Sequence, residues 1–152
     1  DSILDLLDSD NINVLTYVIA FLSNVVIHPD AAVSCSKQLQ GIVDLFDKVN
    51  NDEYLTYEIV NILKRIVTCP EASITIDNKK AISDLFTNAE KHINDNLFSS
   101  YLELIAGFVC LQNGSECLAS TNLQNELSNV LDIIDKDDYR RIIITSIISH
   151  QK

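Results

Sequence analysis

The hexamer Ile42–Asp47, IVDLFD, has close relatives elsewhere in the chain, and their spacing indicates the fold. Related hexamers are ILDLLD at Ile3–Asp8, ISDLFT at Ile82–Thr87 and LSNVLD at Leu127–Asp132. Their first residues lie 39, 40 and 45 positions apart. In each hexamer the apolar residues occupy positions i, i+3 and i+4, which predicts the buried face of a helix. We therefore expect a short helix of the same kind about every forty residues.

A longer helical pattern follows each hexamer. Apolar residues recur at i, i+3, i+4 and i+7 through Val14–Ile27, Tyr54–Val67 and Leu97–Leu111. The fourth stretch, Tyr139–Ile148, contains a β-branched run that would also suit a strand. Its place in the repeat favours a helix.

Two prolines keep the same register as the long helices. Pro29 and Pro70 are 41 residues apart, as are the apolar pairs that begin at Val18 and Ile59. Each proline follows an apolar run and precedes an acidic residue, a pattern typical of a helix start. Self-similarity at about forty residues is typical of a helical solenoid.

Composition agrees with an all-α domain. The chain has 152 residues, 47% of them apolar and 22% charged, which is a globular composition. Only three glycines and two prolines are present, so long helices with short connections are favoured over a β fold rich in turns. We expect residues 1–152 to form one domain. Because the chain starts at Asp1 and has no Met, we expect it to be a piece of a longer polypeptide.

Charge excludes two classes of partner. The net charge is −11 and the eleven Lys and Arg residues are scattered, so binding to nucleic acid or to an anionic membrane is not expected. No apolar run reaches the roughly 20 residues of a membrane helix. The acidic surface would attract a basic peptide or protein, or it only maintains solubility.

The four cysteines, Cys35, Cys69, Cys110 and Cys117, form no C-x-x-C pair and no zinc-site spacing. Buried free thiols suit a reducing compartment, so a cytoplasmic or nuclear location is expected. His28, His92 and His150 lie far apart, and no nucleophile or phosphate-binding motif occurs. The sequence therefore predicts no enzyme activity, metal site or cofactor.

The repeat resembles the armadillo-repeat family, whose units contain three helices. The segments that carry the resemblance are Phe21–Val26, His28–Asp30 and Gly41–Phe46 in one unit, and Ile62–Val67, Pro70-Glu71 and Ile82–Phe86 in the next. The resemblance implies a right-handed superhelix of three to four repeats, with the long third helices lining a concave groove. That groove holds extended peptides or partner helices in the family. HEAT-type helix pairs are the alternative.

Residues four apart lie on one face of a helix, so each long helix would present a polar stripe to that groove. The predicted partner-binding residues are Thr16 and Asn24 on the first helix, Tyr57, Glu58, Asn61 and Arg65 on the second, and Ser99 and Glu103 on the third. The alternative is that these stripes are ordinary solvated faces of amphipathic helices.

The expected function is a non-catalytic protein–protein interaction module that binds a peptide or helix of a partner. The alternative is a structural or regulatory segment without a groove ligand, acting in oligomerisation or in autoinhibition as in formin-like armadillo domains. The C-terminal stretch RRIIITSIISHQK is too apolar for the polar cap of a solenoid. It would need a following repeat, a ligand or a second copy bound through Ile147 and Ile148.

Overall fold

The computed structural model describes residues 2–150, and every regular element in that range is a helix, which confirms the predicted all-α class. No described helix is both long enough and apolar enough to cross a membrane. The chain divides into two compact units, of which the first ends at Asn78 and the second begins at Lys79. The single domain predicted for residues 1–152 stays a prediction.

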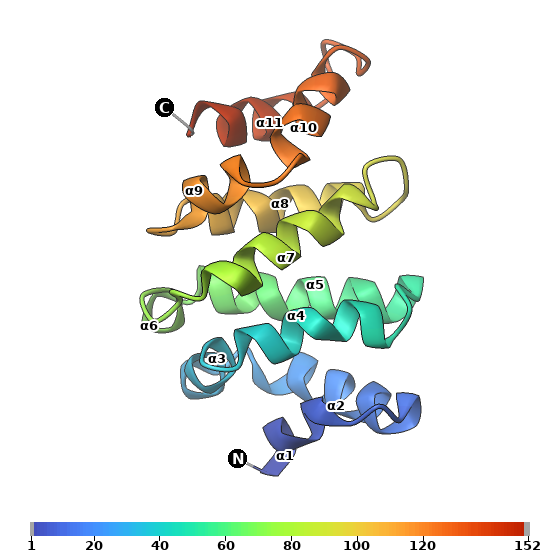
Figure 1. Cartoon of the computed structure of the whole chain (residues 1–152), viewed down its shortest axis with the longest axis vertical. Helices are drawn as coiled ribbons and strands as arrows, with labels where there is room; N and C mark the ends of the chain where they lie inside the picture. The colour runs from blue at the N-terminus through green and yellow to red at the C-terminus, as the bar shows by residue number, and fades with distance from the viewer. Residues whose placement is uncertain (1, 151–152) are drawn as a thin grey trace. The chain divides into compact units, whose positions relative to one another are not determined.

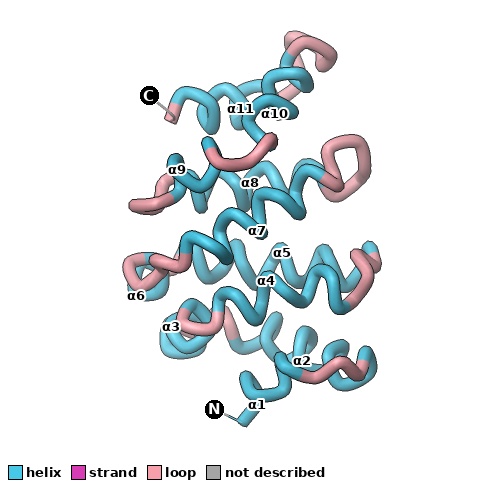
Figure 2. The backbone as a smooth tube through the Cα atoms, viewed as in Figure 1, coloured by secondary structure: helices cyan, strands magenta, loops and turns pink. Residues whose placement is uncertain are grey.

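The first unit contains one 3-10 helix and six α-helices joined by short loops (Figures 1 and 2). In chain order they are α1 (Ser2–Asp5), η1 (Leu6–Asp8), α2 (Ile12–Val25), α3 (Pro29–Ser36), α4 (Leu39–Lys48), α5 (Glu53–Thr68) and α6 (Pro70–Ser73). The long helices α2 and α5 pack against each other, α3 packs against α6, and α4 packs against α5. Pro29 and Pro70 are the first residues of α3 and α6, as predicted.

The hexamer of α4 has the buried face that its spacing predicts. Ile42, Leu45 and Phe46 are buried, whereas Asp44 and Asp47 are exposed. The related hexamers in α7 and α10 bury Ile82, Leu85 and Phe86, and Leu127 and Val130. These apolar positions are therefore core residues of the two units.

The first hexamer differs from the others because its helix changes type within the motif. Residues 3–5 continue α1, but Leu6–Asp8 form the 3-10 helix η1, and Leu6 remains 42% exposed. The carbonyl groups at this end are satisfied from a distant helix. The Lys48 ammonium donates to the carbonyl oxygens of Leu7, at 2.7 Å, and Ser9, at 3.4 Å. Unpaired carbonyls at a helix end need such donors, and the hexamer alone does not contain one.

Asparagines and an aspartate set the boundaries of the two long helices. The Asn11 side chain accepts hydrogen bonds from the backbone of the first turn of α2, and the Asp52 carboxylate accepts one from Leu55 N at 3.0 Å in α5. Between α4 and α5, Asn50 and Asn51 have φ values of 54° and 53°. Asparagine tolerates this left-handed region better than most residues, so the chain turns sharply there and starts α5 at a defined point.

The second unit contains α7 (Lys79–Glu90), α8 (Phe98–Val109), α9 (Gly114–Ala119), α10 (Leu123–Leu131) and α11 (Arg140–Ser149). Helix α8 packs against α11 and α9, and α10 packs against α7 and α11. The β-branched stretch at the C-terminus is helical in α11, which confirms the predicted helix. Gln151 and Lys152, which end the predicted apolar segment, lie outside the described residues.

A polar cluster joins α7 to α8 in the second unit, with Asn88, His92 and Tyr101 buried and Asp95 exposed. His92 follows α7, stacks on the Tyr101 ring at 5.0 Å between centroids, and pairs through Nδ1 with Asp95 Oδ2 at 2.7 Å. The Tyr101 hydroxyl donates to the Asn88 side-chain oxygen. Burial, with a smaller contribution from the Asp95 charge, raises the pKa of Tyr101 far above its ordinary value. The Tyr101 hydroxyl therefore stays protonated and serves as a structural donor.

Candidate functional site

Helix α5 carries a row of polar residues beside its buried face. Leu55, Ile59, Val60, Ile62, Leu63 and Ile66 are buried. Glu58 and Asn61 are half-buried and Arg65 is exposed. Their spacing of three and four residues places the carboxylate, the amide and the guanidinium on one face of the helix, in that order.

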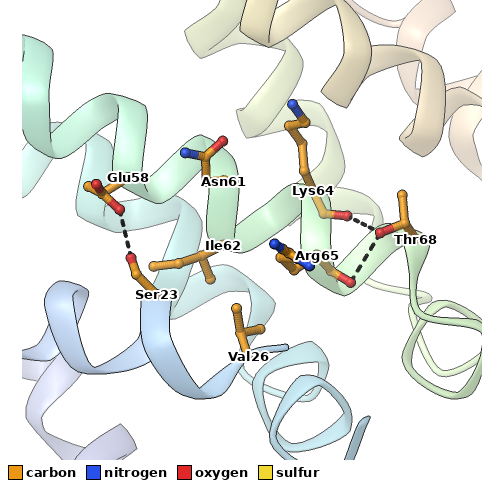
Figure 3. A pocket seen from close by; sticks show the side chains of 8 residues that line it. All are labelled: Ser23, Val26, Glu58, Asn61, Ile62, Lys64, Arg65 and Thr68. Carbon is orange, nitrogen blue, oxygen red and sulfur yellow. Dashed lines mark hydrogen bonds between the residues drawn. The ribbon is translucent and has the colours of Figure 1, made fainter. Parts of the chain in front are cut away.

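These three side chains line a pocket of about 500 Å³ where α5 packs against α2. The full lining consists of Ser23 and Val26 at the end of α2, and Glu58, Asn61, Ile62, Lys64, Arg65 and Thr68 of α5. Figure 3 shows the α2 residues beneath the α5 row, with Ile62 directed toward them. The pocket therefore has an apolar floor of Val26 and Ile62 and a polar rim.

One end of the pocket is held by a hydrogen bond between the two helices. The Ser23 hydroxyl donates to Glu58 Oε2 at 2.9 Å (Figure 3). Because an ionised carboxylate is a strong acceptor, this bond fixes the Glu58 side chain toward α2. It also uses part of the acceptor capacity of Glu58, since a carboxylate has several lone-pair positions.

The other end of the pocket is positively charged. Lys64 and Arg65 are adjacent in the last turns of α5, and Figure 3 shows the Lys64 chain on the side away from Ser23 and Val26. The Thr68 hydroxyl donates to the Lys64 carbonyl oxygen at 2.7 Å and so is committed to the helix backbone. Within residues 2–150, neither the Asn61 amide nor the Arg65 guanidinium has a side-chain hydrogen bond or ion pair.

The structure thus brings together three of the eight predicted partner-binding residues, Glu58, Asn61 and Arg65. Tyr57 is exposed on the neighbouring face of α5 but does not line the pocket. Thr16 and Asn24 are exposed on α2 and bond to their own helix. The Thr16 hydroxyl donates to the Ile12 carbonyl at 2.7 Å and the Asn24 amide donates to the Ala20 carbonyl at 3.0 Å.

The two predicted residues of α8 belong to the second unit. Ser99 lines an open pocket of about 550 Å³ with Asp135, Asp137, Asp138, Tyr139 and Arg140. Its hydroxyl oxygen accepts a hydrogen bond from the Tyr139 hydroxyl at 3.0 Å. Glu103 is exposed on the same helix and does not line this pocket.

Sequence reasoning missed Ser23, Lys64 and Thr68 as pocket residues. The prediction assumed that equivalent positions of successive long helices face a common groove. The pocket instead lies between two packed helices, so α2 and α5 contribute opposite flanks, and the residue of α2 that faces α5 is Ser23 rather than Asn24. A shift of one position turns a side chain by about 100° around a helix. The one indication in the sequence is that Ser23 is a small polar residue adjacent to Asn24, which was a predicted partner-binding residue.

A second pocket of the first unit, about 320 Å³, is lined mainly by apolar residues of α1, α2 and α3, including Phe21 and Cys35. Desolvation by burial raises the pKa of the Cys35 thiol to about 11, so it is a thiol rather than a thiolate near neutral pH. Among residues 2–150, no three His, Cys, Asp or Glu side chains are placed to hold a metal ion.

Comparison with known proteins identifies no relative from which a function could be transferred: no protein-family model, curated protein or solved structure matches this chain.

Proposed function

We propose that the chain is an armadillo-like helical-repeat domain, with HEAT-like pairing as the alternative, and that it acts as a non-catalytic protein-interaction module. The order of helices supports the repeat. A long helix, a shorter helix and a helix with a buried hexamer face follow one another as α2, α3 and α4, then as α5, α6 and α7, and then as α8, α9 and α10. Prolines begin α3 and α6, and the packing of α2 on α5 and of α3 on α6 is what stacked units would give.

The proposed ligand is a peptide segment of another protein, bound in the pocket between α2 and α5. The observation that carries this function is the row of Glu58, Asn61 and Arg65 along a pocket with an apolar floor. An asparagine amide presents both a donor and an acceptor, so it can pair with the N–H and the C=O of a peptide backbone. A floor of Val26 and Ile62 would accept an apolar side chain of the same segment.

An intracellular location belongs to the same proposal. All four cysteines are free, and Cys35 and Cys117 are buried. Free buried thiols are common in proteins of reducing compartments, because an oxidising compartment favours paired cysteines. The cytoplasm or nucleus is therefore the compartment in which we place the binding.

The proposed function is tested by selecting peptides on the immobilised chain from a random linear library and measuring their affinities by fluorescence anisotropy. Wild type is compared with Asn61→Ala and with Asn24→Ala, a matched control because Asn24 is an exposed α2 asparagine outside the pocket. Loss of two peptide hydrogen bonds should weaken binding about tenfold for Asn61→Ala and leave Asn24→Ala unchanged. Selected peptides that bind both variants as tightly as wild type would overturn the assignment of the pocket.

Self-association through α11 is the second candidate, and exposed isoleucine favours it. Ile142 is 77% exposed and Ile148 is half-buried, whereas Ile147 is only 1% exposed. Burial removes Ile147 from any contact surface, so a polar residue there would test stability instead of association. If α11 self-associates, the molar mass from light scattering should rise with concentration and return to the monomer value in Ile142→Glu. A monomer at all concentrations would exclude this candidate.

A further inference from the structure

We infer that the segment held in the α2–α5 pocket is acidic, and that an Asp or Glu side chain of that segment pairs with Arg65. This inference rests on the proposed function and names the chemistry of the partner. It opposes the expectation from net charge, which is −11 for the whole chain and favours a basic partner. The charges around the pocket decide between the two.

The charge that the pocket leaves for a ligand is positive. Among its ionisable lining residues, Glu58 is engaged by Ser23, whereas no described residue pairs with the Arg65 guanidinium. At physiological ionic strength, charges more than about 8 Å apart on the surface are largely screened from each other. A bound side chain therefore responds to the residues that line the pocket more strongly than to the distant acidic surface.

Glu58 does not neutralise Arg65. The two residues are seven positions apart in α5, which is about 10 Å along the helix axis. The Glu58 carboxylate is instead held by the Ser23 hydroxyl at the opposite end of the pocket (Figure 3). The α5 row therefore offers a fixed carboxylate at one end and, at the other, a guanidinium that no described residue pairs with.

Arg65 is suited to a carboxylate by its geometry as well as by its charge. A guanidinium is planar and donates through a fork of N–H groups that matches the two oxygens of a carboxylate. No described residue accepts a hydrogen bond from the Arg65 side chain, so the fork can form without breaking an existing pair. Asn61 lies one turn away and would hold the peptide backbone next to the acidic residue.

Arg65 also has a purely structural explanation. It lies in the last turn of α5, where a positive charge opposes the helix dipole. That role would make the residue important for stability and irrelevant to ligand choice. The two roles are separable, because only pairing with a ligand couples Arg65 to one acidic residue of a peptide.

The test is a double-mutant cycle on the full chain, with the acidic peptide of highest affinity from the library selection as the probe. Arg65→Gln, and separately the Asp→Asn or Glu→Gln change in the peptide, should each weaken binding about 10- to 100-fold. Both changes together should weaken it little further, which is the mark of a direct pair. Lys37→Gln is the matched control, because it removes the same charge at an exposed residue outside the pocket, and it should change the affinity less than twofold.

The outcomes separate this inference from the proposed function. Peptides that depend on Asn61 but tolerate Arg65→Gln, or that carry no acidic residue, overturn the acidic partner and leave the peptide site standing. Peptides that depend on neither residue overturn both. Additive losses in the cycle also overturn the pairing, since Arg65 would then act on the peptide only through its general charge.

Discussion

Replacing Gly114 by alanine should destabilise the second unit strongly, because the missing side chain leaves room for the backbone of α8. Gly114 is buried and is the first residue of α9, which follows α8 after a short connection. A Cβ atom at this position would lie 2.1 Å from the Phe108 carbonyl oxygen and 2.7 Å from Val109 Cα. Both obstacles are main-chain atoms, so no side-chain rotation can remove them.

The size of the effect follows from that geometry. Real Cβ atoms essentially never approach within 3.0 Å, so the contact at 2.1 Å must open by about 0.9 Å. Overpacking of this kind costs about 3 kcal/mol when neighbours cannot yield by changing rotamer. In a chain of this size, that loss corresponds to a fall in Tm of about 6–12 °C.

Urea unfolding followed by far-UV circular dichroism measures the free energy directly. Gly41→Ala in α4 is the matched control, because its Cβ would meet side-chain atoms of Leu7 and no backbone, Cδ1 at 3.3 Å and Cβ at 3.7 Å. Helix propensity favours alanine over glycine by about 1 kcal/mol inside a helix, which offsets the small adjustment of Leu7. The control should therefore stay within about 1 kcal/mol of wild type. A loss below about 1 kcal/mol for Gly114→Ala would refute the steric reasoning.

Three further changes have defined outcomes. Thr56 is buried and its hydroxyl has no hydrogen-bond partner among the described residues. Thr56→Val should therefore raise the free energy of unfolding, measured in urea, by about 1 kcal/mol, because the buried hydroxyl is desolvated without compensation. A lower free energy of unfolding in the variant would contradict this reasoning. Hydrogen bonds from Arg140 lower the pKa of Asp138 from 3.8 to about 2, so the stability from this contact is present above pH 3.8 and lost as the pH falls toward 2. Asp138→Asn should consequently show a shallower loss of stability over that pH range, and a slope equal to wild type would count against the pairing. In the native protein, iodoacetamide should modify the exposed Cys110 and spare the buried Cys35. Peptide mass mapping measures the labelling of each cysteine, and equal labelling of the two would contradict the burial of Cys35.

The helices themselves follow from local sequence. Apolar residues spaced at three and four, prolines at helix starts and side-chain caps such as Asp52 act over one or two turns, so they can be recognised without the fold. The apolar face of the hexamer at Ile42–Asp47 is buried, as its spacing predicts. The C-terminal stretch forms the helix α11, although its β-branched composition alone would also suit a strand.

The end of the first hexamer and the lining of the pocket depend on contacts between residues far apart in the sequence. The first hexamer ends in a 3-10 turn whose Leu7 carbonyl accepts a hydrogen bond from Lys48, 41 residues further along the chain. The pocket includes Ser23 instead of Asn24 because the rotation of α2 against α5 is set by core packing along both helices, which no single stripe of residues encodes.

Local sequence is therefore enough to predict the helical class, the approximate boundaries of the long helices and the candidate residues Glu58, Asn61 and Arg65 on α5. The packing of α2 on α5 places Ser23 against Glu58, and among the described residues none pairs with the Arg65 guanidinium; neither could be read from one helix alone. The two kinds of feature depend on interactions over different distances along the sequence. Helix formation depends on neighbours within a few residues, whereas the charge and lining of a pocket depend on which flanks of two separate helices meet.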